Sequence, residues 1–377
     1  MARGALKEYK GNELAEALQG LWQELLERGV VKAIILPMEV EGGLVAPGIL
    51  TDPDRARESR ALAPYMPVNT ARVLQMMTKT VPPSEKVAVV LRPCETRALV
   101  ELVKLKQISL ANLTVISIDC PGTYPLETYR RIIAEGDDPG MLLLEKMNRG
   151  DEDEQLRESC RICLHPRAPW ADIRIGFLGL HDKRTLLIET LTEGGEQVIR
   201  ELGMEVTDIP VKEREAFLKQ LLAQRKKGEQ KVLEEQQDNL RGADKLLTAL
   251  SACIGCRNCM TMCPICYCRE CLFNSPTFEL EADRYMGLAQ KRGAARMPAD
   301  MLLFHITRMA HMASSCVQCG MCDEACPVEV PVFRLFKATS AQVQELLNYE
   351  AGRDLEEEIP ISTFREEELD KVQEPKI

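Results

Sequence analysis

Two cysteine runs with identical spacing constrain this chain more than any other feature. Both follow the pattern Cys-x2-Cys-x2-Cys-x3-Cys-Pro, and the proline turns the chain away after the fourth cysteine. The runs comprise Cys253, Cys256, Cys259 and Cys263, and then Cys316, Cys319, Cys322 and Cys326. Three cysteines at every third position of a tight loop can reach three corners of one polynuclear centre, whereas the fourth points elsewhere. The chain must therefore fold around two such centres.

This spacing is typical of bacterial ferredoxins with two 4Fe-4S clusters, in which the fourth cysteine ligates the other cluster. The predicted ligands of one cluster are Cys253, Cys256, Cys259 and Cys326, and those of the other are Cys316, Cys319, Cys322 and Cys263. Paired zinc knuckles are the alternative, although zinc sites usually use two separate Cys-x2-Cys pairs. The long, helix-patterned interval between the runs favours an α-helical dicluster ferredoxin domain.

Three further cysteines, Cys266, Cys268 and Cys271, follow the first run in "CYCREC". They are either a third metal site, shared with a partner or not, or structural thiols beside the cluster loop. The structural interpretation is favoured because three cysteines without a fourth local ligand do not complete a site. His305 and His311 lie on the next helical pattern, where a histidine is more often structural than a ligand.

The first part of the chain alternates strand and helix patterns. Residues 86–91 and 113–119 read as strands around a helix at 95–107, and a right-handed crossover makes these strands parallel. Cys94 and Cys120 directly follow the two strands, at the sheet edge where open α/β folds bind ligands. Together with the pair Cys160 and Cys163, they predict a third 4Fe-4S cluster. Scattered buried cysteines are the alternative.

The remaining patterns define four regions. Residues 1–18 read as polar and helical, 30–38 and 42–50 as extended, and 120–160 as helical. A hairpin is expected from 171–180 and 184–190, around "HDK". The expected domains are an α/β domain with parallel strands and a 4Fe-4S site (1–205), a charged helical connector (206–250), a helical ferredoxin domain (251–340) and an acidic tail (341–377).

Composition limits the function classes. The 377 residues include 15 cysteines, and thiolate ligands in such number indicate a reducing, cytoplasmic setting rather than disulfides. No apolar run is long enough to span a membrane, and the N-terminus does not resemble a signal peptide. The net charge of −10 argues against nucleic acid as a partner.

Several segments resemble a known family. "RPCETRAL", "ISIDCPG" and "ESCRICLHPRAPWADIRIGFLG" resemble the beta-subunit family of coenzyme F420 hydrogenases and dehydrogenases. "CPICYCREC" and "FHITRMAHMASSCVQCGMCDEACPVEVP" resemble the beta subunits of cytoplasmic formate dehydrogenases. The resemblance covers about residues 60 to 340. It implies an FAD beside a 4Fe-4S cluster in the N-terminal domain, and three 4Fe-4S clusters in all.

The flavin site is the least defined part of this prediction. The chain has no GxGxxG or Walker-type loop, so the site must be specific to the family. By position, Asn69, Thr70, Arg72 and Arg92 are the candidate contacts to a ribityl or phosphate group. Ordinary loop polarity, with Asn69 or Thr70 capping a helix, is the alternative.

The resemblance implies a subunit that converts between two-electron and one-electron transfer, since a flavin does both and a cluster carries one electron. The primary catalytic site would lie on another subunit, of formate dehydrogenase alpha or hydrogenase type. F420, NAD(P)H, a ferredoxin and a heterodisulfide-reductase-like flavoprotein all remain candidate electron partners. The alternative is a pure electron relay with no diffusible substrate.

Overall fold

The structure is a computed structural model that describes residues 2–8, 14–180, 185–240, 242–276, 282–293 and 300–363. The chain forms two compact units. The first comprises Met1–Gln230 together with two later segments, Val317–Gly320 and Ala351–Ile359. The second comprises Lys231–Cys316, Met321–Glu350 and Pro360–Ile377. Each unit is described below by itself.

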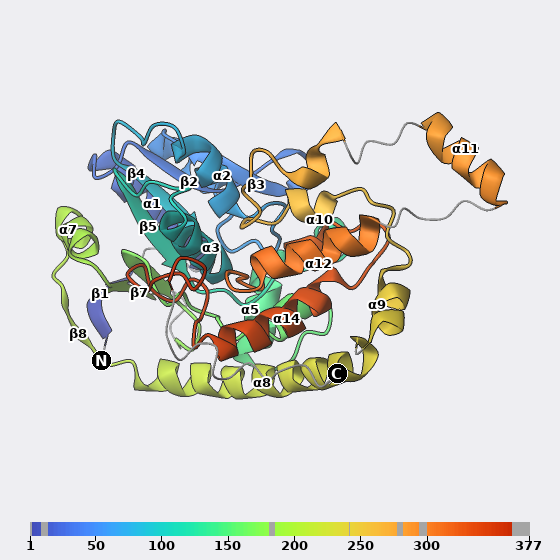
Figure 1. Cartoon of the computed structure of the whole chain (residues 1–377). Helices are drawn as coiled ribbons and strands as arrows, with labels where there is room; N and C mark the ends of the chain where they lie inside the picture. Colours follow the sequence, from blue (N-terminus) through green and yellow to red (C-terminus); the bar gives the residue numbers. More distant parts are fainter. Residues whose placement is uncertain are drawn as a thin grey trace. The chain divides into compact units, whose positions relative to one another are not determined.

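An eight-stranded mixed sheet is the centre of the first unit (Figure 1). In spatial order its strands are β3 (Val45–Leu50), β2 (Ala33–Glu39), β4 (Val87–Leu91), β5 (Leu113–Ile118), β6 (Ile173–Gly176), β7 (Thr185–Thr190), β1 (Ala2–Glu8) and β8 (Thr207–Ile209). β2, β4, β5 and β6 run parallel, and the other neighbours pair antiparallel.

The strand chemistry explains this order. β4 reads "VAVVL", and its residues from Ala88 onward are buried, as expected for a parallel strand covered on both faces. β3 contains Pro47, which cannot donate to a ladder and is tolerated because β3 is an edge strand. The predicted parallel strands around a helix are confirmed as β4, α3 (Pro93–Lys104) and β5.

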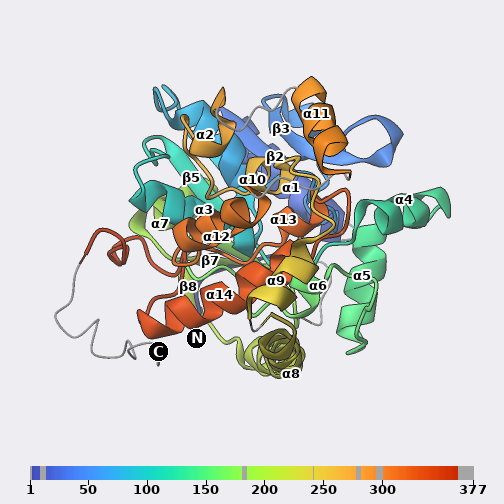
Figure 2. The same ribbon diagram turned by 45° about the vertical axis from the view of Figure 1, so that its right-hand side comes forward.

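Helices cover this sheet and its edges. In the first unit they are α1 (Leu14–Glu27), α2 (Thr70–Thr78), α3, α4 (Leu126–Ala134), α5 (Pro139–Asn148), α6 (Glu158–Arg161) and α7 (Glu193–Glu201), with short 3-10 turns at Glu41–Gly43 and Pro53–Glu58. α1 buries Leu18, Trp22 and Leu25 in the main core. The predicted helical character of 120–160 is confirmed by α4, α5 and α6, of which α4 and α5 lie side by side in Figure 2.

The prediction that the first residues are helical is wrong for β1. Ala2–Glu8 pairs with β7 on one side and β8 on the other, so tertiary pairing overrides the polar, helix-like composition. Gly4 permits the close approach, because a Cβ there would clash with the carbonyl of Ile188. The predicted hairpin is confirmed as the antiparallel pair β6 and β7, while its "HDK" turn lies outside the described residues.

A single long helix, α8 (Lys212–Leu240), begins in the first unit (Figure 1). The predicted helical character of this region is confirmed, but the first unit extends to Gln230 rather than ending at residue 205. The reason lies in the buried face of α8. Leu218, Arg214 and Arg225 are buried there, and the two arginines bond to loops of the first unit.

The described part of the second unit is built from helices and loops. The helices are α9 (Ala243–Leu250), α10 (Asn258–Thr261), α11 (Ala282–Arg292), α12 (Asp300–Met312), α13 (Met321–Glu324) and α14 (Val332–Leu346), with a 3-10 turn at Leu272–Asn274. The expected start of an acidic tail at residue 341 differs from the structure, because α14 continues to Leu346. Its buried Gln344 donates to the carbonyls of Ala313 (3.1 Å) and Cys316 (3.0 Å). Residues 364–377 lie outside the described part.

Two late segments of the chain belong to the first unit through α3. The buried guanidinium of Arg97 donates to the carbonyls of Ala351 (2.9 Å) and Val317 (3.1 Å). The carboxylate of Glu101 accepts from the backbone N–H of Gly352 at 2.8 Å. Gly352 has φ +76° and packs so closely on Arg97 that no side chain fits. These buried polar bonds fix both segments on α3.

Among the described residues, no helix combines the length and the apolar character that crossing a bilayer would require.

Candidate iron-sulfur centres

The first unit brings together four cysteines from three segments of the chain, here called the N-terminal thiol set: Cys94, Cys120, Cys160 and Cys163. Cys94 lies in the first turn of α3, Cys120 follows β5, and Cys160 lies in α6. Burial, with Glu95, Cys319, Cys120 and Cys163 adding to it, raises the pKa of Cys94 well above its usual value. Burial also raises the pKa of Cys120 to about 12. Arg92 acts to lower this pKa, whereas Cys160 and Cys163 raise it further. Cys94, Cys120 and Cys163 therefore lie within electrostatic reach of one another, and Cys160 lies within reach of Cys120.

A buried ion pair fixes the backbone directly before Cys120. Asp119 follows β5 and accepts from Arg214 of α8 through both carboxylate oxygens, at 2.6 and 2.9 Å. The same carboxylate accepts from the backbone N–H groups of Phe177 (2.9 Å) and Leu178 (2.8 Å). Charge-assisted, two-pronged pairing of this kind is geometrically specific. It holds the loop after β5 in register with the loop after β6.

Positive charge and hydrogen-bond donors surround the sulfur atoms of Cys160 and Cys163. The hydroxyl of Thr123 lies 3.2 Å from Cys160 Sγ, and the backbone N–H of His165 donates to Cys163 Sγ at 3.4 Å. Burial raises the pKa of Cys160, but Arg157, Thr123 and then Arg225 more than offset this, so the pKa is lowered overall. These groups favour the thiolate of Cys160, the form that ligates iron.

Arg225 also braces the backbone of the N-terminal thiol set. Its guanidinium donates to the carbonyls of Cys163 (3.2 Å) and Pro121 (2.7 Å). It thereby ties the loop of Cys120 to that of Cys163. The bracing fixes loop positions that the sheet alone does not determine.

The second unit contains a corresponding arrangement, here called the first dicluster set: Cys253, Cys256, Cys259 and Cys326. All four line one small cavity, whose wall is completed by apolar side chains including Phe304 and Val330. Burial raises the pKa of Cys259 to about 11. Arg308 acts to lower this pKa, whereas Cys253, Cys256 and Cys326 raise it further. Cys326, distant in sequence, thus lies beside the first three cysteines of the other run.

The two cysteine loops share one backbone conformation. In each loop the residues before and after the second cysteine have left-handed φ angles. They are Gly255 (+68°) and Arg257 (+62°) in the first loop, and Gln318 (+59°) and Gly320 (+70°) in the second. Arg257 and Gln318 are not glycines, so this conformation carries backbone strain. The repeated pattern shows that both runs form the same tight turn around their second cysteine.

The remaining cysteines of the two runs, here called the second dicluster set, are Cys263, Cys316, Cys319 and Cys322. Cys263 and Cys322 lie in the second unit, where both raise the pKa of Arg308. Cys319 lies in Val317–Gly320, a segment of the first unit, where it raises the pKa of Cys94. The nearness of Cys319 to Cys94 had no signal in the sequence.

Two residues of α12 that the sequence left without a role contact the first dicluster set. Arg308 donates to Cys259 Sγ and to the Cys259 carbonyl, both at 3.0 Å. His305 places Nε2 3.4 Å from Cys253 Sγ. Burial, and then Arg308, lowers the pKa of His305 to about 4, so its imidazole is neutral near pH 7. An arginine on the apolar stripe of this helix was the one available sequence signal.

The three cysteines of "CYCREC" lie around the end of the first run. Burial and then Cys263 raise the pKa of Cys266 to about 12, with contributions from Cys268 and Cys271. Cys271 Sγ lies 3.9 Å from Met260 Sδ, and Cys268 is exposed. In the part of the chain that the structure describes, no group of three or more His, Cys, Asp or Glu residues is arranged to hold a single metal ion.

The candidate flavin contacts lie at the start of α2 and α3. Asn69 is the N-cap of α2 and accepts from the Ala71 N–H at 3.1 Å. Thr70 donates from its backbone N–H (2.9 Å) and its hydroxyl (2.7 Å) to the Glu95 carboxylate. Buried Asn69 Nδ2 has no hydrogen-bond partner among the described residues.

Arg92 and Arg72 complete this group. Arg92 is buried and donates to the carbonyls of Ala63 (2.7 Å) and Tyr65 (2.9 Å), so its guanidinium braces the loop before α2. Arg72 is half-buried in the first turn of α2. The capping interpretation holds for Asn69 Oδ1, whereas both N–H donors of its Nδ2 have no acceptor among the described residues.

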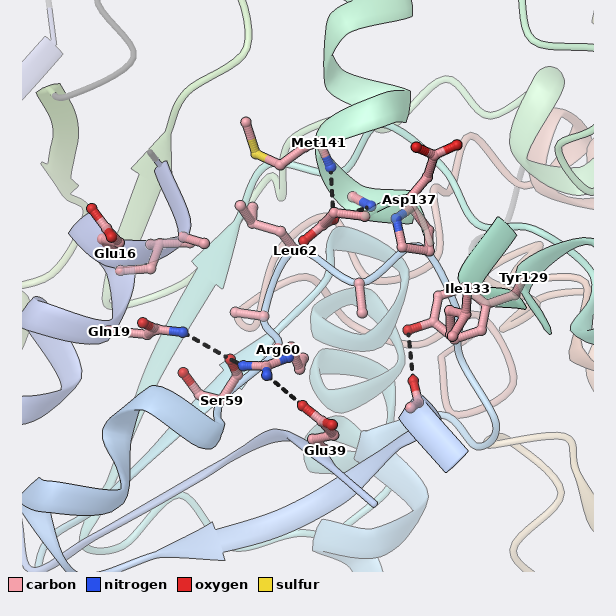
Figure 3. Close-up of a pocket in the computed structure, with 18 of the residues that line it drawn as sticks. Glu16, Gln19, Glu39, Ser59, Arg60, Leu62, Tyr129, Ile133, Asp137 and Met141 are labelled. Carbon is pink, nitrogen blue, oxygen red and sulfur yellow. Dashed lines mark hydrogen bonds and ion pairs between the residues drawn. The ribbon is translucent and has the colours of Figure 1, made fainter. Parts of the chain in front are cut away.

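A larger cavity of about 440 Å³ lies elsewhere in the first unit (Figure 3). Arg60 lines this cavity. Its guanidinium pairs with Glu39 and donates to the Arg57 carbonyl at 2.7 Å. Gln19 and Tyr129 also contribute to the wall. None of the four flavin candidates is among the residues that line it.

Clustered thiols on an α/β sheet, followed by a helical unit with two repeated cysteine loops, define an iron–sulfur protein of the electron-transfer class. Residues 84–213 match the family that comprises the C-terminal part of the beta subunit of coenzyme F420 hydrogenase/dehydrogenase. Residues 249–330 match the "4Fe-4S dicluster domain". The resemblance inferred from the sequence is thus confirmed, as a match of residues 84–213 to the F420 hydrogenase/dehydrogenase beta-subunit family.

Two curated relatives match nearly the whole chain. The F420-dependent formate dehydrogenase subunit beta of Methanocaldococcus jannaschii is 25% identical over 374 residues, covering 91% of this chain and 93% of that protein. The F420-dependent formate dehydrogenase 1 subunit beta of Methanococcus maripaludis is 27% identical over 375 residues, covering 91% and 92%. Among solved structures, the F420-reducing [NiFe] hydrogenase complex from Methanosarcina barkeri matches with a TM-score of 0.45 and 14% identity, over 65% of this chain and 94% of that chain.

Proposed function

We propose that this chain is the iron–sulfur flavoprotein subunit of a cytoplasmic oxidoreductase complex of formate dehydrogenase or hydrogenase type. The observation that carries the proposal is the N-terminal thiol set, which the fold assembles at the carboxyl edge of a parallel sheet. The two relatives named as formate dehydrogenase beta subunits support the class of complex. The primary catalytic site would lie on a separate alpha-type subunit.

Three 4Fe-4S clusters are proposed, one for each of the N-terminal, first dicluster and second dicluster sets. The spacing of the runs and the position of Cys326 beside Cys259 support the crossed ligand assignment. Cys319, a member of the second dicluster set, lies near Cys94 within the first unit. Exposed Cys256 favours electron transfer between the first dicluster set and a partner.

FAD is proposed as the cofactor of the first unit, where it would exchange electron pairs with F420 or another two-electron carrier and single electrons with the clusters. The unpartnered Asn69 Nδ2 fits such a group, because a buried amide N–H without an acceptor is otherwise unfavourable. Arg72 would pair with a phosphate. Thr70 and Arg92 would act mainly by holding the loop, since their polar groups already bond to the protein.

The second candidate function is a pure electron relay between a catalytic subunit and a ferredoxin or heterodisulfide-reductase-like partner. Two observations favour it. Thr70 and Arg92 are engaged internally, and none of the four flavin candidates lines the large cavity of the first unit. A relay of this kind would keep all three clusters and would need no flavin.

Anaerobic reconstitution of the full chain with iron, sulfide and FAD tests both proposals. The flavoprotein proposal predicts about twelve irons per chain and one bound FAD that is bleached by reduced F420 or NADH. About twelve irons without any flavin would reject it in favour of the relay. An iron content near zero, with zinc in its place, would reject both.

A further inference from the structure

Arg308 is a buried cation in the middle of the second unit. Its side chain lies on α12, and the residue is only 3% exposed. The guanidinium lies over the rings of Phe304 (5.4 Å) and Phe336 (4.9 Å). Cation–π contacts of this kind compensate a guanidinium partly for lost water, and arginine accepts burial better than lysine. The position is therefore built to keep a positive charge away from solvent.

The hydrogen bonds of Arg308 point toward sulfur. Nη1 donates to Cys259 Sγ and Nη2 to the Cys259 carbonyl, both at 3.0 Å. Nε is buried and has no hydrogen-bond acceptor among the described residues. A buried donor without an acceptor is unfavourable, and a cluster sulfide is an acceptor that the protein itself does not supply. The donor set thus fits an iron–sulfur cluster on this side of Arg308.

The thiolates around Arg308 belong to both dicluster sets. Burial lowers the pKa of Arg308, but Cys259, then Cys263, Cys322 and Cys266, more than offset this and raise it. Cys259 belongs to the first dicluster set, whereas Cys263 and Cys322 belong to the second. One cation is therefore within electrostatic reach of ligands from both proposed clusters.

We propose that Arg308 raises the reduction potential of the cluster that the first dicluster set would hold. The inference rests on the proposed function, since it takes the two ligand sets as given. Each one-electron reduction makes a cluster with its thiolates one charge more negative, and the cluster that donates that electron becomes one charge less negative. A fixed cation and hydrogen bonds to sulfur both stabilise the reduced form and raise the potential.

Arg308 acts on the first dicluster set through a direct hydrogen bond, since Nη1 donates to Cys259 Sγ of that set. His305 Nε2, 3.4 Å from Cys253 Sγ, adds a second hydrogen-bond partner to the same set. These hydrogen bonds raise the reduction potential of the first dicluster set. An electron that enters the second unit is therefore expected to remain on that cluster.

Redox titration of the reconstituted full chain, followed by electron paramagnetic resonance, tests this role. Arg308→Gln keeps a hydrogen-bond donor and removes the charge, whereas Arg308→Lys keeps the charge. The matched control is Arg334→Gln, which removes a partly exposed cation of the same unit that pairs with Glu235 at 3.5 Å. Iron content is measured for every variant.

Arg308→Gln is expected to retain its iron and to shift the potential of the first dicluster set to a more negative value, by at least tenfold in the one-electron equilibrium constant, about 59 mV. Arg308→Lys is expected to shift this potential less, and Arg334→Gln to leave it unchanged. Potentials in Arg308→Gln equal to those of Arg334→Gln would overturn the proposal. Loss of iron in both Arg308 variants would also overturn it, because the residue would then serve assembly. A wild-type chain that takes up no iron would instead reject the proposed function.

Discussion

Arg214 and Asp119 form a buried, two-pronged ion pair, with Nη1–Oδ2 at 2.6 Å and Nη2–Oδ1 at 2.9 Å. The pair joins the first turns of α8 to the end of β5, and Asp119 directly precedes Cys120. Gly176 leaves the space for the guanidinium, because a Cβ there would lie 2.8 Å from its central carbon. A charged residue of a helix that reads as a solvated connector is thus a support of the N-terminal thiol set.

Arg214→Met is expected to lower the free energy of unfolding by about 3–5 kcal/mol, because it leaves the Asp119 carboxylate buried and uncompensated. Arg200→Gln is the matched control. It breaks an exposed pair with Glu196 and is expected to cost about 0–1 kcal/mol. Anaerobic denaturant titration of the reconstituted chain measures both. Equal effects of the two substitutions would contradict the assigned role, and adding Asp119→Asn to Arg214→Met is expected to restore part of the loss.

Cys94→Ala is expected to remove about four irons per chain, since the N-terminal cluster would lose one of its four ligands. The control is Cys268→Ala, a change at an exposed cysteine outside all three ligand sets, which is expected to leave the iron content unchanged. Iron and sulfide analysis after anaerobic reconstitution provides the measurement. An unchanged iron content in Cys94→Ala would rule out that ligand assignment.

Cys326→Ser and Cys263→Ser are expected to perturb different clusters. Cys326 lies beside Cys259 and lines the same cavity as Cys253, so its loss acts on the first dicluster set. Cys263→Ser acts on the second set instead. The spectra of the reduced variants, recorded by electron paramagnetic resonance, distinguish the two. If each run instead ligated a cluster of its own, the spectrum of Cys326→Ser would match that of Cys322→Ser rather than that of Cys253→Ser.

Asp153 is expected to make stability depend on pH in acid. Burial raises its pKa, but hydrogen bonds from Lys146 and Tyr124, and the Gln155 N–H, outweigh this and lower the pKa below 3.8. Its stabilisation is fully present above the ordinary carboxyl pKa and is lost as pH falls through the lowered value. Asp153→Asn is expected to lower the unfolding free energy at pH 7 by about 1–3 kcal/mol and to flatten the dependence below about pH 4. Denaturant titrations at several pH values measure the unfolding free energy of both proteins. If Asp153→Asn kept the pH dependence of the wild type, the acid sensitivity would belong to other carboxylates.

The sequence predicted much of the fold because its signals were local. The apolar run of β4, the helical spacing of α3 and the repeated cysteine loops each lie within a short window and were read directly. β1 was missed because its pairing with β7 depends on residues far along the chain. The cysteine spacing likewise identified candidate ligands, while the roles of Arg308 and Arg214 depend on which distant groups the fold brings beside them.

The bonds from Arg97 to Val317 and Ala351 have a consequence for synthesis of the chain. A ribosome that has produced only the first 230 residues has not yet supplied the acceptors for this buried guanidinium, nor the Gly352 N–H that Glu101 binds. The sheet can form during translation, but the buried polar groups of α3 gain all their partners only after residue 352 has left the exit tunnel. Iron loading at Cys94, in the first turn of that helix, is therefore expected to finish late, after nearly the whole polypeptide has been made.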